Sequence, residues 1–149
     1  MPAQEIVLST HGAAAILAPN SKLSVNFDHG SAIITVLPSP SIIEEWIHFS
    51  IPSPPPEYPL FKDVSALFTH DRDVEVTGIE LYQGDSQLLH KDDTIVTSAT
   101  PYYLENPTEY GRVGVLASVR VKFLPTSSTS VRLTLVSVGV VAAAKPELI

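Results

Sequence analysis

The stretch Gly111–Leu124, with the sequence GRVGVLASVRVKFL, decides the fold class. Every odd-numbered position from Val113 to Phe123 is apolar. The even-numbered positions include polar side chains: Arg112, Ser118, Arg120 and Lys122. Because successive side chains of a β-strand point to opposite faces, one face of this strand is buried and the other faces water. This alternation is typical of an antiparallel sheet with one covered face.

Two further predicted strands change phase in the middle. In Asp73–Tyr82 the apolar positions are even-numbered before Gly78 and odd-numbered after it. In Val131–Val141 they are odd-numbered up to Leu135 and even-numbered from Val136 onward. A one-residue shift moves every following side chain to the other face of the sheet. Each change therefore predicts a β-bulge, with glycine as the natural bulge residue in the first strand.

Period-two alternation recurs along the chain, and helical periodicity does not. Turn-forming residues separate further predicted strands: Glu5–Thr10, Ala13–Leu17, Leu23–Phe27, Ala32–Leu37, Ile42–Ile51, Lys62–Thr69, Gln87–His90 and Thr94–Ser98. The segment Thr100–Tyr110 lacks a strand pattern and predicts a long loop, a type of segment that is often functional. About ten short strands predict a single domain over residues 1–149 with an all-β fold, an antiparallel and jelly-roll-like β-sandwich. A closed β-barrel is the alternative.

The composition narrows the classes of partner. Nine Lys and Arg against 16 Asp and Glu give a net charge of −7, so we expect no nucleic acid and no membrane among the partners. No run approaches the roughly 20 apolar residues of a membrane helix, and the N-terminus has no signal-peptide pattern. The chain has no cysteine, which fits a cytoplasmic location. No nucleotide-binding or zinc-protease motif occurs, so we expect no cofactor and no metal.

Several short segments follow one another in a set order: His11-Gly12, WIHFSIPSP at 46–54, Tyr82-Gln83-Gly84, Asn106-Pro107, Gly111 and Gly114-Val115. Together they resemble a family of small all-β proteins of unknown function, over nearly the whole chain from His11 to about Val141. The resemblance implies a sandwich fold and brings no established activity. Members of that family carry a stretch rich in tryptophan and glycine where this chain reads VNFDHG, at 25–30. Any role of that stretch is therefore not carried over.

Trp46 and His48 form the first candidate site. In Ile42–Ile51 they share one face of the strand, and the other face holds apolar side chains: Ile43, Ile47, Phe49 and Ile51. An exposed tryptophan can stack on a sugar or another planar ligand, or anchor a subunit interface. In the alternative, Trp46 packs under the proline segment 52–56 and His48 forms a hydrogen bond with the backbone.

The second candidate is the segment YYLENPTEY at 102–110. Its tyrosines, Tyr102, Tyr103 and Tyr110, offer rigid and amphipathic contact surface of the kind that binding loops favour. Glu105 beside them is a candidate acid or base. In the alternative, this loop folds over one end of the sandwich and its rings are buried.

Two polar clusters, HDRD at 70–73 and HKDD at 90–93, contain the residue types of a general base with its orienting carboxylate, or of a metal site. Adjacent residues of a strand point to opposite faces, which argues against a joint role. We therefore interpret both clusters as charged turns.

Two functions of different classes remain open. The first is a non-catalytic ligand-binding or assembly module that presents its aromatic residues to a small molecule, a glycan or another subunit. The second is a cofactor-free cyclase or isomerase that acts on an apolar metabolite in an internal pocket, with His48, Tyr103 or Glu105 as acid or base. We also expect a homo-oligomer, because the apolar C-terminal strand offers an edge that needs covering.

Overall fold

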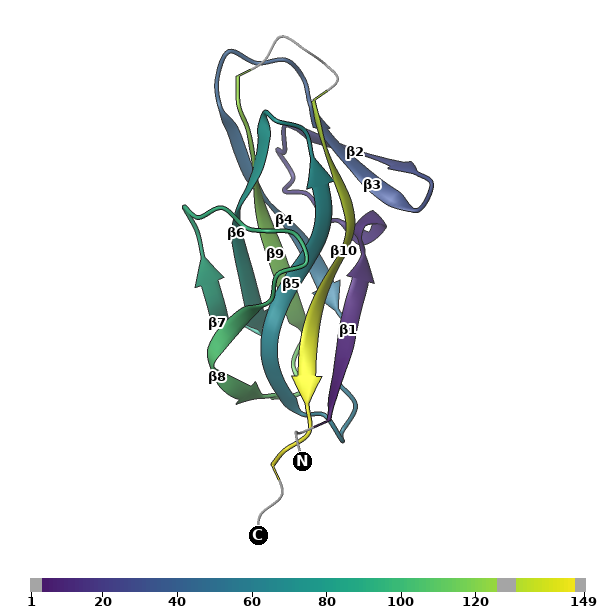
Figure 1. Ribbon diagram of the computed structural model, residues 1–149, viewed down its shortest axis with the longest axis vertical. Coiled ribbons are helices and arrows are strands. Elements are labelled where there is room, and N and C mark those ends of the chain that lie inside the picture. The colour runs from purple at the N-terminus through teal and green to yellow at the C-terminus, as the bar shows by residue number, and fades with distance from the viewer. Residues whose placement is uncertain (1–3, 126–130, 147–149) are drawn as a thin grey trace.

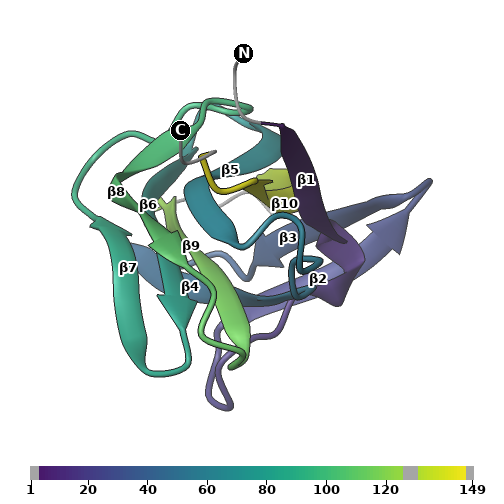
Figure 2. The ribbon, with the colours of Figure 1, turned by 90° about the horizontal axis from the view of Figure 1, so that it is seen from below.

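The computed structural model describes residues 4–125 and 131–146, which fold into two antiparallel β-sheets packed face to face (Figure 1 and Figure 2). The strands of the six-stranded sheet are β1 (Glu5–His11), β2 (Leu23–Asp28), β3 (Ser31–Val36), β5 (Leu60–His70), β8 (Tyr102–Glu109) and β10 (Arg132–Ala143). The four-stranded sheet has the order β4-β9-β6-β7, with bounds Ile43–Ile51, Val115–Phe123, Val74–Gln83 and Ser86–Lys91. Within the described residues, each sheet ends in edge strands that are paired on one side only. The predicted sandwich is therefore confirmed, and the closed barrel is not formed.

Strand β10 lies in the middle of the six-stranded sheet. β5 pairs with one of its edges, while β3 and β1 share the other, β3 along 132–135 and β1 along 137–143. The register between β10 and β5 shifts between Leu135 and Ser137, which confirms the bulge predicted at this phase change. Because β10 is paired on both edges, the expectation that it offers an open apolar edge is wrong.

The junction between β1 and β3 needs a glycine. The short helix η1 (Gly12–Ala14) begins where β1 ends beside the bulge of β10. A Cβ atom on Gly12 would lie 2.1 Å from the backbone oxygen of Leu135, so no larger residue fits without moving the backbone. The predicted strand Ala13–Leu17 is wrong, because η1 takes up its first residues. Only Ile16 of this segment pairs, through an isolated bridge to His48 of the edge strand β4.

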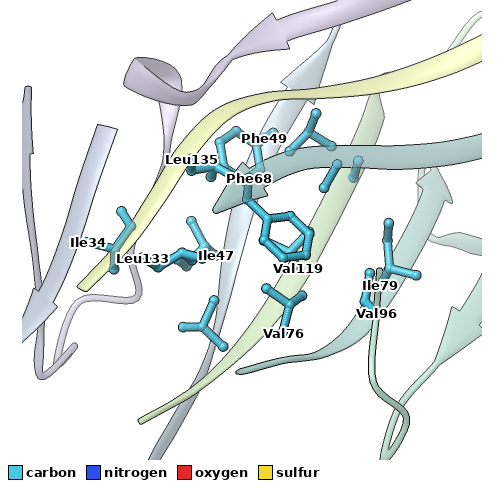
Figure 3. Packing of buried hydrophobic residues seen from close by; sticks show 14 of the residues in the cluster. Ile34, Ile47, Phe49, Phe68, Val76, Ile79, Val96, Val119, Leu133 and Leu135 are labelled. Carbon is cyan, nitrogen blue, oxygen red and sulfur yellow. The ribbon is translucent and has the colours of Figure 1, made fainter. Parts of the chain in front are cut away.

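The hydrophobic core lies between the two sheets (Figure 3). The six-stranded sheet contributes Ile34, Phe68, Leu133 and Leu135, and the four-stranded sheet contributes Ile47, Phe49, Val76, Ile79 and Val119. All of these side chains are buried, and burial of each such side chain stabilises the fold by about 1.5–3 kcal/mol. The apolar positions predicted from Val115 to Phe123 enter this core, whereas Val113 is exposed, because β9 begins only at Val115 and the predicted strand is too long at its start.

Two sequence predictions about segments near the edge of the sandwich are wrong. Residues 94–98 form no strand, although the amide of Val96 donates to the carbonyl of Val76 at 2.8 Å and its side chain is buried. The predicted loop 100–110 contains strand β8, which pairs with β5 only near its two ends. A register shift in the middle accommodates Pro107, and proline is tolerated there because β8 is an edge strand.

Candidate functional site

A row of polar side chains crosses all four strands on the outer face of the four-stranded sheet. His48 of β4 lies opposite Ser118 of β9, Ser118 lies opposite Glu80 of β6, and Glu80 lies opposite His90 of β7. We call these four residues the polar row. Neighbouring strands are about 4.8 Å apart, so the row spans about 14 Å. Strand β4, strand β9 and the hairpin of β6 and β7 thus bring polar side chains together on the outer face of this sheet.

A bulge in β6 places Glu80 in this row. The register between β6 and β9 shifts between Val76 and Gly78, which confirms the bulge predicted at this phase change. The unpaired residue is Thr77, so the prediction of glycine as the bulge residue is wrong, because Gly78 pairs with Arg120. Before the shift Val76 points into the core, and after it Ile79 and its alternate neighbours do so. Glu80 therefore faces outward beside Ser118.

His48 is bonded to the neighbouring residue of the polar row. Its Nδ1 atom lies 2.7 Å from the hydroxyl oxygen of Ser118, so the predicted alternative of a backbone partner for this ring is not what the structure shows. The side chain of Ser118 is fully buried. A buried hydroxyl cannot reach a substrate, so this pair positions the His48 ring instead of forming a nucleophile and base.

His90 lies between two carboxylates. Its Nδ1 atom is 2.5 Å from an oxygen of Glu80, which is buried, and its Nε2 atom is 3.1 Å from an oxygen of Asp92. Hydrogen bonds from the ring to Asp92 and Glu80 raise the pKa of His90 above its ordinary value, and partial burial opposes this shift. The protonated ring can donate to both carboxylates at once, which favours the charged form.

Trp46 lies next to the polar row and reaches across the sheet. Trp46 pairs with Arg120 of β9, and Arg120 pairs with Gly78 of β6. A Cβ atom on Gly78 would lie 2.7 Å from Cη2 of Trp46, so the indole ring occupies the space that a side chain at position 78 would fill. The Arg120 guanidinium carbon is 5.9 Å from the indole centroid, and the His90 ring is 6.0 Å from it at an interplanar angle of 37°. We call this half-buried indole with its neighbours the Trp46 platform.

Ion pairs hold Arg120 beside the indole. One oxygen of Glu44 lies 2.6 Å from the Arg120 guanidinium, and the other accepts a hydrogen bond of 2.9 Å from the hydroxyl of Thr77. Asp93 lies 3.5 Å from the same guanidinium. The platform is therefore bordered by fixed hydrogen-bonding groups of both charges.

The tyrosines of residues 102–110 do not form one exposed surface. Tyr102 and Tyr110 are packed against the core, and the oxygen of Tyr102 accepts a hydrogen bond of 3.0 Å from the amide of Thr97. Tyr103 is 63% exposed and lies on β8, opposite Asp63 of β5. Glu105 is exposed on the same strand.

The candidate residues therefore separate into two groups on different sheets. Trp46 and His48 belong to the four-stranded sheet, whereas Tyr102, Tyr103 and Glu105 belong to β8 of the six-stranded sheet. No group of three His, Asp or Glu residues with the geometry of a metal site occurs among the described residues.

The cluster at 70–73 is held as a turn. Nδ1 of His70 lies 2.8 Å from the backbone oxygen of Asp71, and the Asp71 carboxylate accepts a hydrogen bond of 2.8 Å from the amide of Arg132. Its carboxylate is thus used to join this turn to the start of β10. The other cluster differs, because His90 and Asp92 lie within ion-pair distance of each other and the His90 ring lies beside the indole of Trp46.

Comparison with known proteins gives no assignment. No model of a protein family matches the sequence, and no curated protein matches it. The resemblance to a family of small all-β proteins therefore stays a prediction. In the described parts of the chain, no helix has the length and apolar character needed to cross a membrane.

Sequence reasoning missed several members of the site. It identified Trp46 and His48 but assigned no role to Ser118, Arg120 or Glu80. A usable signal existed, because alternation places Ser118 and Arg120 on the outward face of β9, and the phase change in β6 places Glu80 on the outward face of that strand. What the sequence did not provide was the register that places them opposite one another.

Proposed function

We propose that this protein is a non-catalytic binding module that holds its ligand on the Trp46 platform. The observation that supports the proposal is the half-buried indole fixed against Gly78, between Arg120 and His90. An aromatic ring that no neighbour holds would lose rotamer freedom when it binds a ligand. Here the sheet holds the ring in place, so little conformational entropy remains to be lost on binding.

The surroundings of the ring favour a polyhydroxylated or planar small molecule, with a glycan as the leading class. An indole face offers apolar stacking area, and its polar neighbours can hydrogen-bond the edge of the ligand. Glu44 and Arg120 are fixed by their mutual ion pair, and His48 is oriented by Ser118. Because donors and acceptors of both charges are present, a neutral ligand with hydroxyl groups matches this border better than a highly charged one.

The alternative of a cofactor-free cyclase or isomerase is supported by no comparable observation. That mechanism needs an acid or base on the wall of an enclosed pocket. His48 lies on the four-stranded sheet, while Tyr103 and Glu105 lie on β8 of the other sheet. The alternative stays a prediction without a defined site.

Intrinsic fluorescence tests the proposal directly, because Trp46 is the only tryptophan of the chain. Titration with a panel of neutral oligosaccharides and planar metabolites is expected to give at least one saturable change in emission. Calorimetry with that ligand should then show loss of binding for Trp46→Ala. Tyr103→Ala is the matched control, since it removes an exposed aromatic ring from the other sheet. Absence of any saturable response, or unchanged affinity of Trp46→Ala, would contradict the proposal.

Self-association and a cytoplasmic location are further parts of this proposal. The paired edges of β10 remove the reason first given for an oligomer, so assembly would have to use another surface, such as the Trp46 platform itself. Size-exclusion chromatography with light scattering on the wild type and on Trp46→Ala tests this. A monomeric wild-type protein would leave ligand binding as the function of the platform.

A further inference from the structure

A hollow of about 500 Å³ lies at one end of the sandwich, away from the polar row. Three segments meet there: the proline-rich connector between β4 and β5, the turn between β8 and β9, and the residues that follow β10. Its volume falls within the range of about 300–1,000 Å³ that is usual for small-molecule sites. We call it the proline–tyrosine hollow.

The walls of this hollow are rigid. Pro54, Pro55, Pro56 and Pro59 line it, and each proline ring fixes a backbone torsion angle. The amide of Tyr58 donates to the carbonyl of Pro55 at 2.9 Å, which closes a turn within the connector. The site therefore exists before a ligand arrives, and ordering it costs little free energy.

Tyr110 joins the hollow to the core. Its amide donates to the carbonyl of Pro59 at 2.7 Å, and its hydroxyl donates to the Ser53 hydroxyl at 2.9 Å. Its ring meets the fully buried ring of Phe61 edge-on, at 5.9 Å and 84°. The hollow thus contains a fixed aromatic ring beside proline rings, which favours a ligand with a flat apolar body.

Arg112 supplies the polar anchor. Lys145 also lines the hollow, but its ammonium is paired with Glu109 at 2.8 Å. Among the residues that the structure describes, the Arg112 guanidinium has no ion-pair partner, although the protein carries a net charge of −7. Arg112 also has a φ of +60°, a left-handed conformation that costs free energy for a residue other than glycine. Such strain at a cavity wall is typical of ligand-binding residues.

We propose that the proline–tyrosine hollow binds a small aromatic carboxylate, with the ring against Tyr110 and the prolines and the carboxylate on Arg112. The arginine fork matches the two oxygens of a carboxylate. Glu57, which also lines the hollow, repels this anion and limits the affinity. The inference does not depend on the Trp46 platform, because the two sites share no residue.

The test uses NMR titration of the ¹⁵N-labelled full-length protein with phenylacetate and with its neutral amide, phenylacetamide. The amide of Gly111, which donates to the side-chain oxygen of Gln83 at 2.5 Å, lies next to Arg112 and reports on the site. We expect phenylacetate to shift this signal saturably and to bind at least tenfold more tightly than phenylacetamide. Equal affinities for the two compounds would overturn the proposal.

Variants separate loss of the anchor from loss of the fold. Arg112→Gly removes the guanidinium and also relieves the left-handed strain, so this variant should be at least as stable as the wild type while binding phenylacetate at least tenfold more weakly. Glu57→Gln should tighten binding severalfold, because a repelling charge is removed. Trp46→Ala should leave phenylacetate binding unchanged. Unaltered affinity of Arg112→Gly, or shifts confined to the signals of the polar row, would refute the assignment.

Discussion

The substitution Gly78→Ala probes the contact on which the Trp46 platform depends. The added Cβ atom would lie 2.7 Å from Cη2 of Trp46, 2.9 Å from the backbone oxygen of Lys91 and 3.1 Å from Cβ of Arg120. The indole can swing away, but the Lys91 oxygen belongs to the paired strand β7 and can move only with that strand. The variant must therefore displace Trp46 and also strain the pairing of β6 with β7.

The expected cost follows from this crowding. Overpacking of one methyl group typically destabilises a protein by about 1–3 kcal/mol. In a protein of about 150 residues, each kcal/mol lowers the melting temperature by about 2–4 °C, which gives a fall of about 2–12 °C. Thermal unfolding followed by circular dichroism measures the fall. The emission maximum of Trp46 in the same sample should move to longer wavelength, because the ring becomes more exposed to water.

Two controls make the result interpretable. Gly114→Ala adds the same methyl group where no atom lies within 4 Å, so its free energy of unfolding should change by less than about 0.5 kcal/mol. In the double variant Trp46→Ala/Gly78→Ala the clash with the indole disappears while the clash with Lys91 remains. The two substitutions should therefore be non-additive by about 0.5–3 kcal/mol. If Gly78→Ala has the same melting temperature as Gly114→Ala, and its Trp46 emission maximum equals that of the wild type, the described packing of Trp46 is wrong.

Three further predictions concern titrating groups and a close contact. Burial raises the pKa of the Asp63 carboxyl above its ordinary value of 3.8, with Glu5 adding to the shift and Lys62 opposing it. Stability is therefore lost as the pH rises from the ordinary pKa through the raised pKa of the folded state. Asp63→Asn should thus increase the free energy of unfolding, measured by urea denaturation, at about pH 7 but not at about pH 3. The raised pKa of His90 stabilises the fold below its ordinary value of 6.5, and this contribution is lost as the pH rises through the folded-state pKa; His90→Gln should thus be more destabilising in urea at about pH 6 than at about pH 9, and equal losses would contradict the ion-pair geometry. Gly12→Ala places a Cβ atom 2.1 Å from a backbone oxygen, so soluble expression should fall, and a melting temperature equal to that of the wild type would show that the junction between β1 and β3 is misplaced.

The sequence was sufficient for the fold class because that class depends on local alternation. The inward faces of β9 and the bulges in β6 and β10 can be read from single strands, since each needs only the order of apolar and polar residues. The same dependence on local alternation explains why strand β8 was not predicted. Its middle is displaced from β5 around Pro107, so its residues show no alternation to detect. A paired but irregular edge strand resembles a loop in sequence.

The candidate site could be predicted only in part, because it depends on register between distant strands. Alternation places Trp46 and His48 on the outer face of β4, and the structure agrees. It does not indicate that His48 lies opposite Ser118, which is 70 residues away in sequence. It also cannot indicate that an indole on β4 reaches past β9 to Gly78. Three strands must be aligned before that contact exists.

The bulge of β6, at Thr77, connects the fold to the site. Without the register shift, the inward positions that begin at Val74 and Val76 would continue through Gly78 to Glu80. The Glu80 carboxylate would then enter an apolar core, where a buried unpaired charge is strongly unfavourable, and Ile79 would face water. The shift reverses both outcomes and brings Glu80 beside His90. Gly78, which follows the unpaired Thr77 of this bulge, is the residue whose missing side chain receives Trp46, so the polar row and the Trp46 platform meet at the same irregularity of β6. The bulge that keeps Glu80 out of the core therefore also sets the geometry of the proposed binding surface.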